Sequence, residues 1–282
     1  YVSLSIDFKK IRYQILKSQL GTLMDFNKNN YNRYFVGKRF IYNNSKFEIK
    51  AGELFIYSGI NKGIDLKYIN PFIPSFLIDI NTSDFENGDN YNSIIFTDFK
   101  YNYNKQLNFI GEFIIDDIQI DATGRENKLG HKLGIYYKRN SKFELFYEHT
   151  KIDPFTYLHN GKFTSYHNYN RPIGYKYGPH SKANDFFIRY YIKEDFSFEL
   201  LLTKLKKGNS TIMDNDYPLS ENSYSSDLKV YNLFDLGLVK YWENICVQIK
   251  YSNFPYVNQE ISGFLEKETK KGFIFDIIYF YE

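Results

Sequence analysis

Three carboxylates stand close together in the middle of the chain, at Asp116, Asp117 and Asp121. Paired carboxylates can act as a general acid and a general base, and several carboxylate oxygens together can bind calcium. Neighbouring residues of a β-strand point to opposite faces, however, so Asp116 and Asp117 do not form a catalytic pair by themselves. We therefore favour a structural role, in which these carboxylates fix a strand end and hold no metal.

A second polar group opens a long irregular stretch and comprises Glu148, His149, Lys151, Asp153, Tyr157 and His159. A nucleophilic Ser-His-Asp arrangement needs a serine in a defined setting, and the sequence has no GxSxG motif. His149 and His159 also lack the spacing of zinc ligands on a helix. Two hypotheses remain: a loop fixed by local hydrogen bonds, or a surface on which aromatic rings stack on sugars while polar groups bind hydroxyls.

An aromatic and basic segment follows between Tyr166 and Lys182. Its candidates for binding an acidic polysaccharide, whose uronates would attract cations, are Tyr169, Arg171, Tyr175, Lys176 and Lys182. A solvated loop is the alternative. Single-stranded nucleic acid binders also mix stacking and basic residues. We expect no nucleic acid partner, because 36 basic residues nearly balance 33 acidic ones.

The composition limits the remaining classes. Cys246 is the single cysteine, so one chain can form neither a disulfide framework nor a CxxC zinc cluster, and we expect no cofactor. The sequence contains no run of about 18 apolar residues, so it predicts no transmembrane helix. Aromatic residues make up 20% of the 282 positions, with 28 Tyr and 27 Phe, and these types favour strands.

Regular alternation of apolar and polar residues is clearest between Lys105 and Arg139. The apolar side chains occupy odd positions on both sides of a polar interval that runs from Asp116 to Lys128, namely Leu107, Phe109, Phe113, Ile115, Leu133, Ile135 and Tyr137. Alternation of this kind predicts two strands of a hairpin with one apolar face. Glu112 and Asp116 belong to the opposite face.

The same pattern predicts strands over residues 2–8, 13–24, 33–42, 46–57, 91–103, 106–116, 131–139, 142–151, 185–193, 196–206, 228–241, 244–253 and 272–281. Residues 13–24 could also form a short helix. Glu53 is out of phase with the apolar residues around it, which indicates a bulge or an internal partner. In the long stretch 58–90, Pro71 and Pro74 favour a fixed extended loop or a short helix, and we expect Asn70 and Pro71 to brace or plug the fold.

Short turns alternate with long loops along the whole chain, as in outer-membrane barrels. A soluble sandwich also alternates, but many of these strands are long enough to cross a bilayer at a tilt. We therefore predict an all-β fold: one domain over residues 1–282, an antiparallel transmembrane β-barrel of about 12–18 strands, with short turns on one rim and long loops on the other. Its odd-numbered apolar residues between 107 and 137 would face lipid.

Several segments then match a known family in order and spacing: ELFIYSG, YINPF, GDNYNSIIFTDFKY, GEFIIDDIQID, YEHTKIDPFTYLH and GYKYGPHSKANDFFIRYYI. The chain resembles the capsule assembly Wzi family, closely over about half its length and elsewhere as barrel strands. His180 stands where we would expect an acidic residue. The resemblance implies an 18-stranded barrel. The smaller number of strands leaves two readings open: an N-terminal portion, including a leader and earlier strands, precedes Tyr1, or the barrel is smaller.

The resemblance also implies the outer membrane of a Gram-negative bacterium and a lectin-like role with capsular or other surface polysaccharide. We therefore expect a non-enzymatic, monomeric barrel whose partners are polysaccharide and outer-membrane lipids. A porin or transporter for small solutes is the alternative. The expected polysaccharide site lies between Glu148 and Lys182, whereas Asp116, Asp117, Asn70 and Pro71 are expected to be structural.

Overall fold

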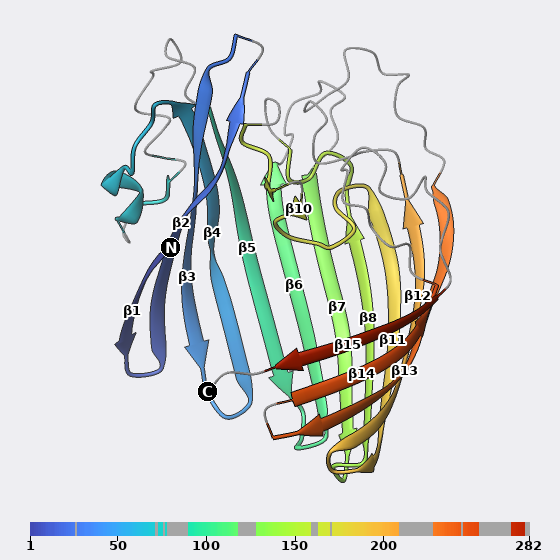
Figure 1. Cartoon of the computed structure of the whole chain (residues 1–282). Coiled ribbons are helices and arrows are strands. Elements are labelled where there is room, and N and C mark those ends of the chain that lie inside the picture. Colours follow the sequence, from blue (N-terminus) through green and yellow to red (C-terminus); the bar gives the residue numbers. More distant parts are fainter. Residues whose placement is uncertain are drawn as a thin grey trace.

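Thirteen antiparallel strands form one sheet, in which each strand pairs with the sheet strands that come before and after it in the chain (Figure 1). The computed structural model describes residues 1–25, 27–70, 73–75, 77, 90–117, 128–158, 163–169, 171–208, 228–243, 245–253 and 272–279. The strands are β1 (Val2–Phe8), β2 (Ile11–Met24), β3 (Asn30–Asn43), β4 (Phe47–Ile60), β5 (Asn90–Asn102), β6 (Leu107–Asp117), β7 (Lys128–Arg139), β8 (Phe143–Ile152), β11 (Ser181–Lys193), β12 (Phe196–Lys207), β13 (Lys229–Trp242), β14 (Ile245–Ser252) and β15 (Gly272–Tyr279). Every predicted strand is confirmed, and β2 settles the helix-or-strand question for residues 13–24. Among the described residues, no helix is long and apolar enough to cross a membrane.

The sheet curves into the wall of a barrel, so that β14 and β15 lie in front of the middle strands in the view of Figure 1. Short turns such as the one at Asn140 and Ser141 lie at one end of the wall, and the strand ends joined by the long connections lie at the other. This confirms the two predicted rims. We call them the short-turn rim and the loop rim.

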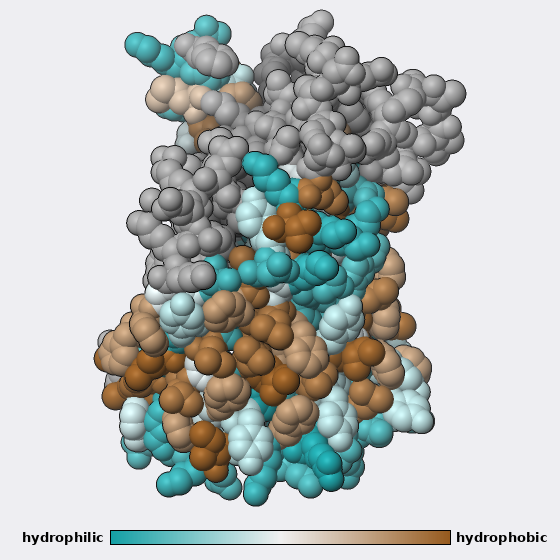
Figure 2. Space-filling model, turned by 90° about the vertical axis from the view of Figure 1, so that its right-hand side faces the viewer, coloured by the Kyte–Doolittle hydropathy of each residue, from teal (hydrophilic) through white to brown (hydrophobic). Residues whose placement is uncertain are grey.

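The outward face of the wall carries large apolar side chains that remain exposed. On β6, β7, β12 and β13 they include Phe113, Ile115, Leu133, Ile135, Leu202, Leu236 and Leu238. Figure 2 shows that apolar residues form a band across the face of the wall in view, with hydrophilic residues on either side of the band. A continuous apolar band of this extent suits contact with lipid. We call it the apolar belt.

Aromatic residues lie on this outward face near the short-turn rim. The rings of Phe47 and Tyr101, on neighbouring strands, stack with their centroids 4.7 Å apart, and Tyr101 is followed along the row by Phe109 at 6.3 Å. Rings at this level match the aromatic girdle that barrels place at the membrane interface.

A short segment after β4 packs against the outside of the wall. The 3₁₀ helix η1 (Leu66–Ile69) places Tyr68 over Tyr57 and Phe55, with ring centroids 4.5 and 5.0 Å apart. Together with side chains of β2 and β3, these rings form a buried apolar cluster. The prediction that this region plugs the barrel is therefore wrong, because it lies outside the wall. Tyr68 packs on the outer side of the wall, and the alternative, that Asn70 and Pro71 brace the fold, stays a prediction.

Glu53 faces the same outward side and is buried beneath this segment. The register of β4 with both neighbouring strands is regular around Glu53, so there is no bulge here. The carboxylate on the apolar face instead has a buried partner. Lys38 is that partner, with its Nζ 3.1 Å from the carboxylate. The Ser75 backbone N–H donates to Glu53 at 2.7 Å, and Lys38 donates to the Ser75 hydroxyl at 2.9 Å.

The inward face near the short-turn rim is charged. Arg189 on β11 donates to Glu199 on β12 at 2.8 Å and lies 3.3 Å from Glu144 on β8. Lys138 on β7 reaches the same Glu144 carboxylate at 2.8 Å. These ion pairs link four neighbouring strands, and they show that the interior of the barrel is polar where its exterior is apolar.

Candidate functional site

The connection between β8 and β11 folds back into the mouth of the barrel. Within it, β9 (His167–Asn168) and β10 (Arg171–Pro172) form a small hairpin, which lies across the loop rim in Figure 1. We call the described parts of this connection, residues 153–158, 163–169 and 171–180, the plug loop. The sequence predicts a binding loop here but does not assign the loop to the interior of the barrel.

The β3 strand holds the plug loop through one buried guanidinium. Arg33 is 1% exposed, and its Nε and Nη2 each donate at 2.7 Å, to the backbone carbonyls of Phe163 and Ser165. Tyr166 reaches further across the interior, where its hydroxyl donates to the Leu54 carbonyl at 2.7 Å. The plug loop is thus fixed to strands that lie more than a hundred positions earlier in the chain.

The β6 and β7 strands hold the other end of the plug loop. The Asp116 carboxylate accepts the Tyr157 backbone N–H at 2.7 Å, and Lys128 donates to the Leu158 carbonyl at 3.1 Å. Asp116 therefore has a structural contact at a strand end. Asp117 pairs with Lys128 in the ladder. Within the described residues, no group of His, Cys, Asp or Glu side chains has the arrangement of a metal site.

A cavity of about 560 Å³ remains beneath the plug loop. This volume falls within the range of about 300–1,000 Å³ typical of small-molecule sites. Its charged lining comes from the inward faces of β3 to β8 and from the plug loop: Arg39, Asp98, Glu112, Lys132, Glu148 and Lys176. Tyr157 and Tyr175 supply aromatic edges, and Leu54, Phe96 and Ile114 supply apolar ones. Charged groups, rings and apolar patches in one cavity suit a sugar, which has both hydroxyls and apolar ring faces.

The acidic and basic groups of the cavity follow the ladder across three strands. Asp98, Glu112 and Lys132 are direct cross-strand neighbours on β5, β6 and β7. Lys132 Nζ lies 2.5 Å from the Glu112 carboxylate, and Lys176 of the plug loop lies 3.4 Å from Asp185 on β11. Carboxylates and cations therefore lie side by side on the cavity wall, and both can bind hydroxyls by charge-assisted hydrogen bonds.

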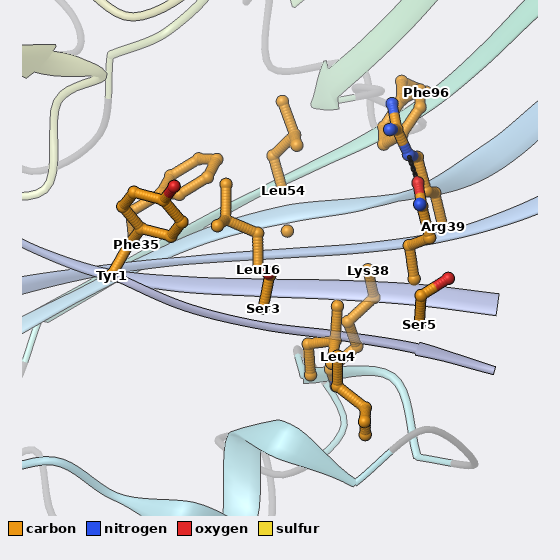
Figure 3. Close-up of a pocket in the computed structure, with 13 residues that line it drawn as sticks. Tyr1, Ser3, Leu4, Ser5, Leu16, Phe35, Lys38, Arg39, Leu54 and Phe96 are labelled. Atoms are coloured by element: carbon orange, nitrogen blue, oxygen red, sulfur yellow. Dashed lines mark hydrogen bonds between the residues drawn. The ribbon is translucent and has the colours of Figure 1, made fainter. Parts of the chain in front are cut away.

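A second pocket of about 380 Å³ adjoins this cavity on the side of β1 to β3 (Figure 3). Arg39, Leu54 and Phe96 line both spaces. The guanidinium of Arg39 is held by Gln14 of β2, to which its Nε donates at 2.9 Å. The second pocket is mainly apolar, so the charged cavity is the stronger candidate for a polar ligand.

The structure divides the predicted polysaccharide residues between the two faces of the wall. Glu148, Tyr157, Tyr175 and Lys176 line the cavity. His149, Lys151 and Lys182 point outward, because they alternate with inward-facing neighbours such as Glu148, Thr150 and Asp185 on the same strands. These residues therefore do not form one contiguous site, because successive side chains of a strand point to opposite faces of the sheet.

The remaining predicted residues have separate surroundings. Asp153 binds Lys151 at the loop rim, 2.8 Å from its Nζ, and Tyr169 is 80% exposed at the tip of the β9–β10 hairpin. Asn70 ends η1 and its backbone N–H donates to the Lys67 carbonyl. The backbone of Arg171 belongs to β10, but its side chain is outside the description. His159 and Pro71 lie outside the described residues.

Four residues that line the cavity were not predicted from the sequence to face a ligand: Arg39, Asp98, Glu112 and Lys132. Only Glu112 was predicted to point into the barrel. A signal for them existed, since each is a charge within a long alternating strand, on the face opposite the apolar one. The order of the strands in space was needed to show that they converge.

Burial raises the pKa of the Tyr157, Tyr175 and Tyr177 hydroxyls above the ordinary value for tyrosine. These hydroxyls are therefore neutral at physiological pH and can both donate and accept hydrogen bonds. A neutral hydroxyl of this kind suits binding of a sugar better than ionic chemistry.

His180 connects the plug loop to β11 and gives this connection a pH dependence. Burial, followed by the Lys207 ammonium, lowers the pKa of its imidazole, and Asp153 opposes this effect. Such a histidine contributes its full stability above its unfolded pKa of about 6.5, and the contribution is lost as the pH falls from there through the lower folded-state pKa. We expect amide hydrogen exchange in residues 171–180, corrected for the intrinsic rate, to be faster at pH 5 than at pH 7.5.

His180→Asn is the control for this prediction, because it keeps a polar side chain that tolerates the left-handed backbone found here (φ 51°) but does not titrate. The additional exchange at pH 5 should disappear in this variant. An equal pH effect in both proteins would assign the opening to another group.

Comparison with known proteins shows the family to which this chain belongs. Residues 10–251 match the family model of the capsule assembly protein Wzi. The chain belongs to the Wzi capsule assembly family. Among curated proteins, none matches the sequence.

A solved Wzi from Escherichia coli, described as a carbohydrate-binding β-barrel of the outer membrane involved in group 1 capsule assembly, shares the fold with a TM-score of 0.58 at 17% identity. The match covers 86% of this chain and 52% of that protein, so the present chain spans about half the length of the solved Wzi. The toluene transporter TodX from Pseudomonas putida matches at a TM-score of 0.40 and 10% identity, over 89% of this chain and 75% of TodX. Its family and the fold that it shares with the solved Wzi make this chain an outer-membrane β-barrel.

Proposed function

We propose that this chain is a non-enzymatic barrel that binds capsular or other surface polysaccharide on the outer face of the outer membrane. One observation carries the proposal: the plug loop is fixed across the mouth of the barrel and leaves beneath it a cavity lined by charges and tyrosines. A barrel closed in this way is suited to holding a ligand at its mouth, and less suited to passing solutes. The Escherichia coli relative is described as carbohydrate-binding, which agrees with this function.

The proposed site consists of the cavity residues Glu148, Tyr175 and Lys176, together with Tyr169, which is exposed at the tip of the β9–β10 hairpin. Lys176 would attract acidic sugars, Glu148 would accept hydrogen bonds from hydroxyls, and the tyrosine rings would pack on sugar faces. We further propose that the barrel is a monomer whose outer wall contacts membrane lipid directly, as the exposed apolar belt suggests.

Two measurements on the purified protein separate binding from transport. We expect capsular polysaccharide of the source bacterium to bind on a glycan surface, and planar bilayers holding the protein to show no steady channel current. Steady currents without glycan binding would replace this function with that of a porin.

A single substitution tests the cavity. We expect Lys176→Met to weaken binding of an acidic polysaccharide by about tenfold or more, because a hydrogen bond to a charged group contributes about 1.5–3 kcal/mol. Lys193→Met removes an equal charge at the short-turn rim and should leave the affinity unchanged. Equal binding by both variants and the parent protein would place the polysaccharide outside the cavity.

A further inference from the structure

Lysine side chains gather on the outward wall beside the loop rim, on the face opposite the cavity. Lys151 on β8 is the cross-strand neighbour of Lys182 on β11, and Lys182 is in turn the neighbour of Lys206 on β12. All three side chains are exposed. Direct neighbours of this kind have Cβ atoms about 5 Å apart, so three ammonium groups form one row.

A second row lies one step closer to the apolar belt. It contains His149 on β8 and the exposed Lys204 on β12, with Asn184 between them on β11. His149 Nδ1 lies 2.9 Å from the Asn184 side-chain oxygen, and His131 extends the upper row on β7 as the neighbour of Lys151. We call these six residues (His131, His149, Lys151, Lys182, Lys204 and Lys206) the basic collar.

The apolar belt begins directly below the basic collar on the same strands. The next row down contains Tyr147, Phe186 and Leu202, which are cross-strand neighbours on β8, β11 and β12. Figure 2 shows the corresponding change on the wall, from an apolar band to hydrophilic residues toward the loop rim. The collar therefore lies where the outer surface of the bilayer meets the protein.

Three lysines in direct register are unfavourable in an isolated sheet, because like charges opposite one another repel. Asp153 offsets part of this charge through its contact with Lys151. Lys182, Lys204 and Lys206 point away from the cavity carboxylates, which the wall separates from them. An external anion would remove the repulsion and would bind several ammonium groups at once.

We propose that the basic collar docks the phosphate groups of a glycolipid in the outer leaflet, whose acyl chains lie along the apolar belt. An occupant at this level must combine an anionic head with an apolar part, because the cations and the belt are continuous on one surface. A polysaccharide without acyl chains satisfies the first requirement alone. Docking at the collar would also hold the barrel at a fixed depth, with the plug loop above the membrane surface.

The test uses the full chain in detergent micelles and native mass spectrometry to count bound lipid. The lipids are a bisphosphorylated, acylated glucosamine disaccharide and the same molecule without its phosphates. We expect the parent protein to bind the phosphorylated lipid at least tenfold more tightly. The variant Lys151→Gln/Lys182→Gln/Lys206→Gln should lose this preference.

A matched variant, Lys10→Gln/Arg139→Gln/Lys193→Gln, removes three exposed charges at the opposite rim and should retain the preference. The collar variant should also unfold at the same or a higher temperature than the parent in lipid-free detergent, because it loses the repulsion. If the triple collar variant does not fold, Lys182→Gln alone is compared with Lys193→Gln.

Four results would overturn the proposal. The collar variant could keep the preference for the phosphorylated lipid, or the opposite-rim variant could lose it as well. Inorganic phosphate at millimolar concentration could displace the lipid completely, which would indicate a site for free anions. Capsular polysaccharide could bind the parent and fail to bind the collar variant while lipid binding stays equal, which would make the collar a polysaccharide surface.

Discussion

Replacing Lys38 with Met should lower the free energy of unfolding by about 3–5 kcal/mol, the usual cost of leaving one partner of a buried ion pair without the other. Lys38 and Glu53 are buried, and each also binds the segment that covers them, through Ser75. Loss of the ammonium leaves the Glu53 carboxylate buried without its cation. Urea unfolding in detergent micelles, followed by tryptophan fluorescence and by heat-modifiable migration on gels, measures the change.

Two further variants decide whether the charge is responsible. Lys38→Met/Glu53→Leu removes both charges and should recover most of the lost stability, since apolar replacements of buried pairs are often neutral. Lys50→Met breaks the more exposed Lys50–Glu48 pair (2.9 Å) on the inward face of β4 and should cost less than about 1 kcal/mol. If the double variant is no more stable than Lys38→Met, lost packing rather than the unpaired carboxylate explains the effect.

Replacing Arg33 with Met should open the barrel. Its guanidinium makes two hydrogen bonds of 2.7 Å to plug-loop carbonyls, and each such bond to a charged donor contributes about 1.5–3 kcal/mol. Their loss should release the middle of the plug loop while the wall stays folded, because the strand ladder does not depend on this side chain. We expect stable single-channel currents in planar bilayers from the variant, and faster proteolysis within residues 163–169.

Arg39→Met is the matched control, because Arg39 lies on the same inward face of β3 and its Nε is bound by Gln14 of the wall instead of by the plug loop. This variant should conduct no more than the parent protein. Equal conductance of the Arg33 variant and the parent would show that Tyr166 and the contacts of Asp116 and Lys128 hold the loop without Arg33.

The strands were predictable because alternation is a local property. Each side chain's face follows from its position parity, so the stretch from Leu107 to Tyr137 already indicated an outward apolar face and an inward Glu112. The surroundings of Glu53 were harder to predict. Its position on the apolar face of the strand indicated a partner, but Lys38 lies on another strand and Ser75 lies in the segment after β4.

The candidate site was only partly predictable for the same reason. Tyr175 and Lys176 were predicted together, and they belong to one loop and line one cavity. Asp98 and Lys132 are far apart in the sequence and were not recognised as ligand-facing groups. Glu148 and His149 were combined, although adjacent strand residues must face opposite sides. The direction of the plug loop could not be read from its composition, because tyrosines and lysines suit an exposed loop as well as a buried one.

The sequence by itself determined the strands, the two rims, the outward apolar face and the family. These depend on side-chain periodicity and on turn residues, which act over a few positions. The tertiary structure alone decided that the plug loop is fixed across the mouth, that charges from β3 to β8 meet beneath it, and that lysines from three strands form a row outside. Each of these depends on which strands are neighbours and in what register, and cross-strand pairing joins residues that the chain order keeps apart.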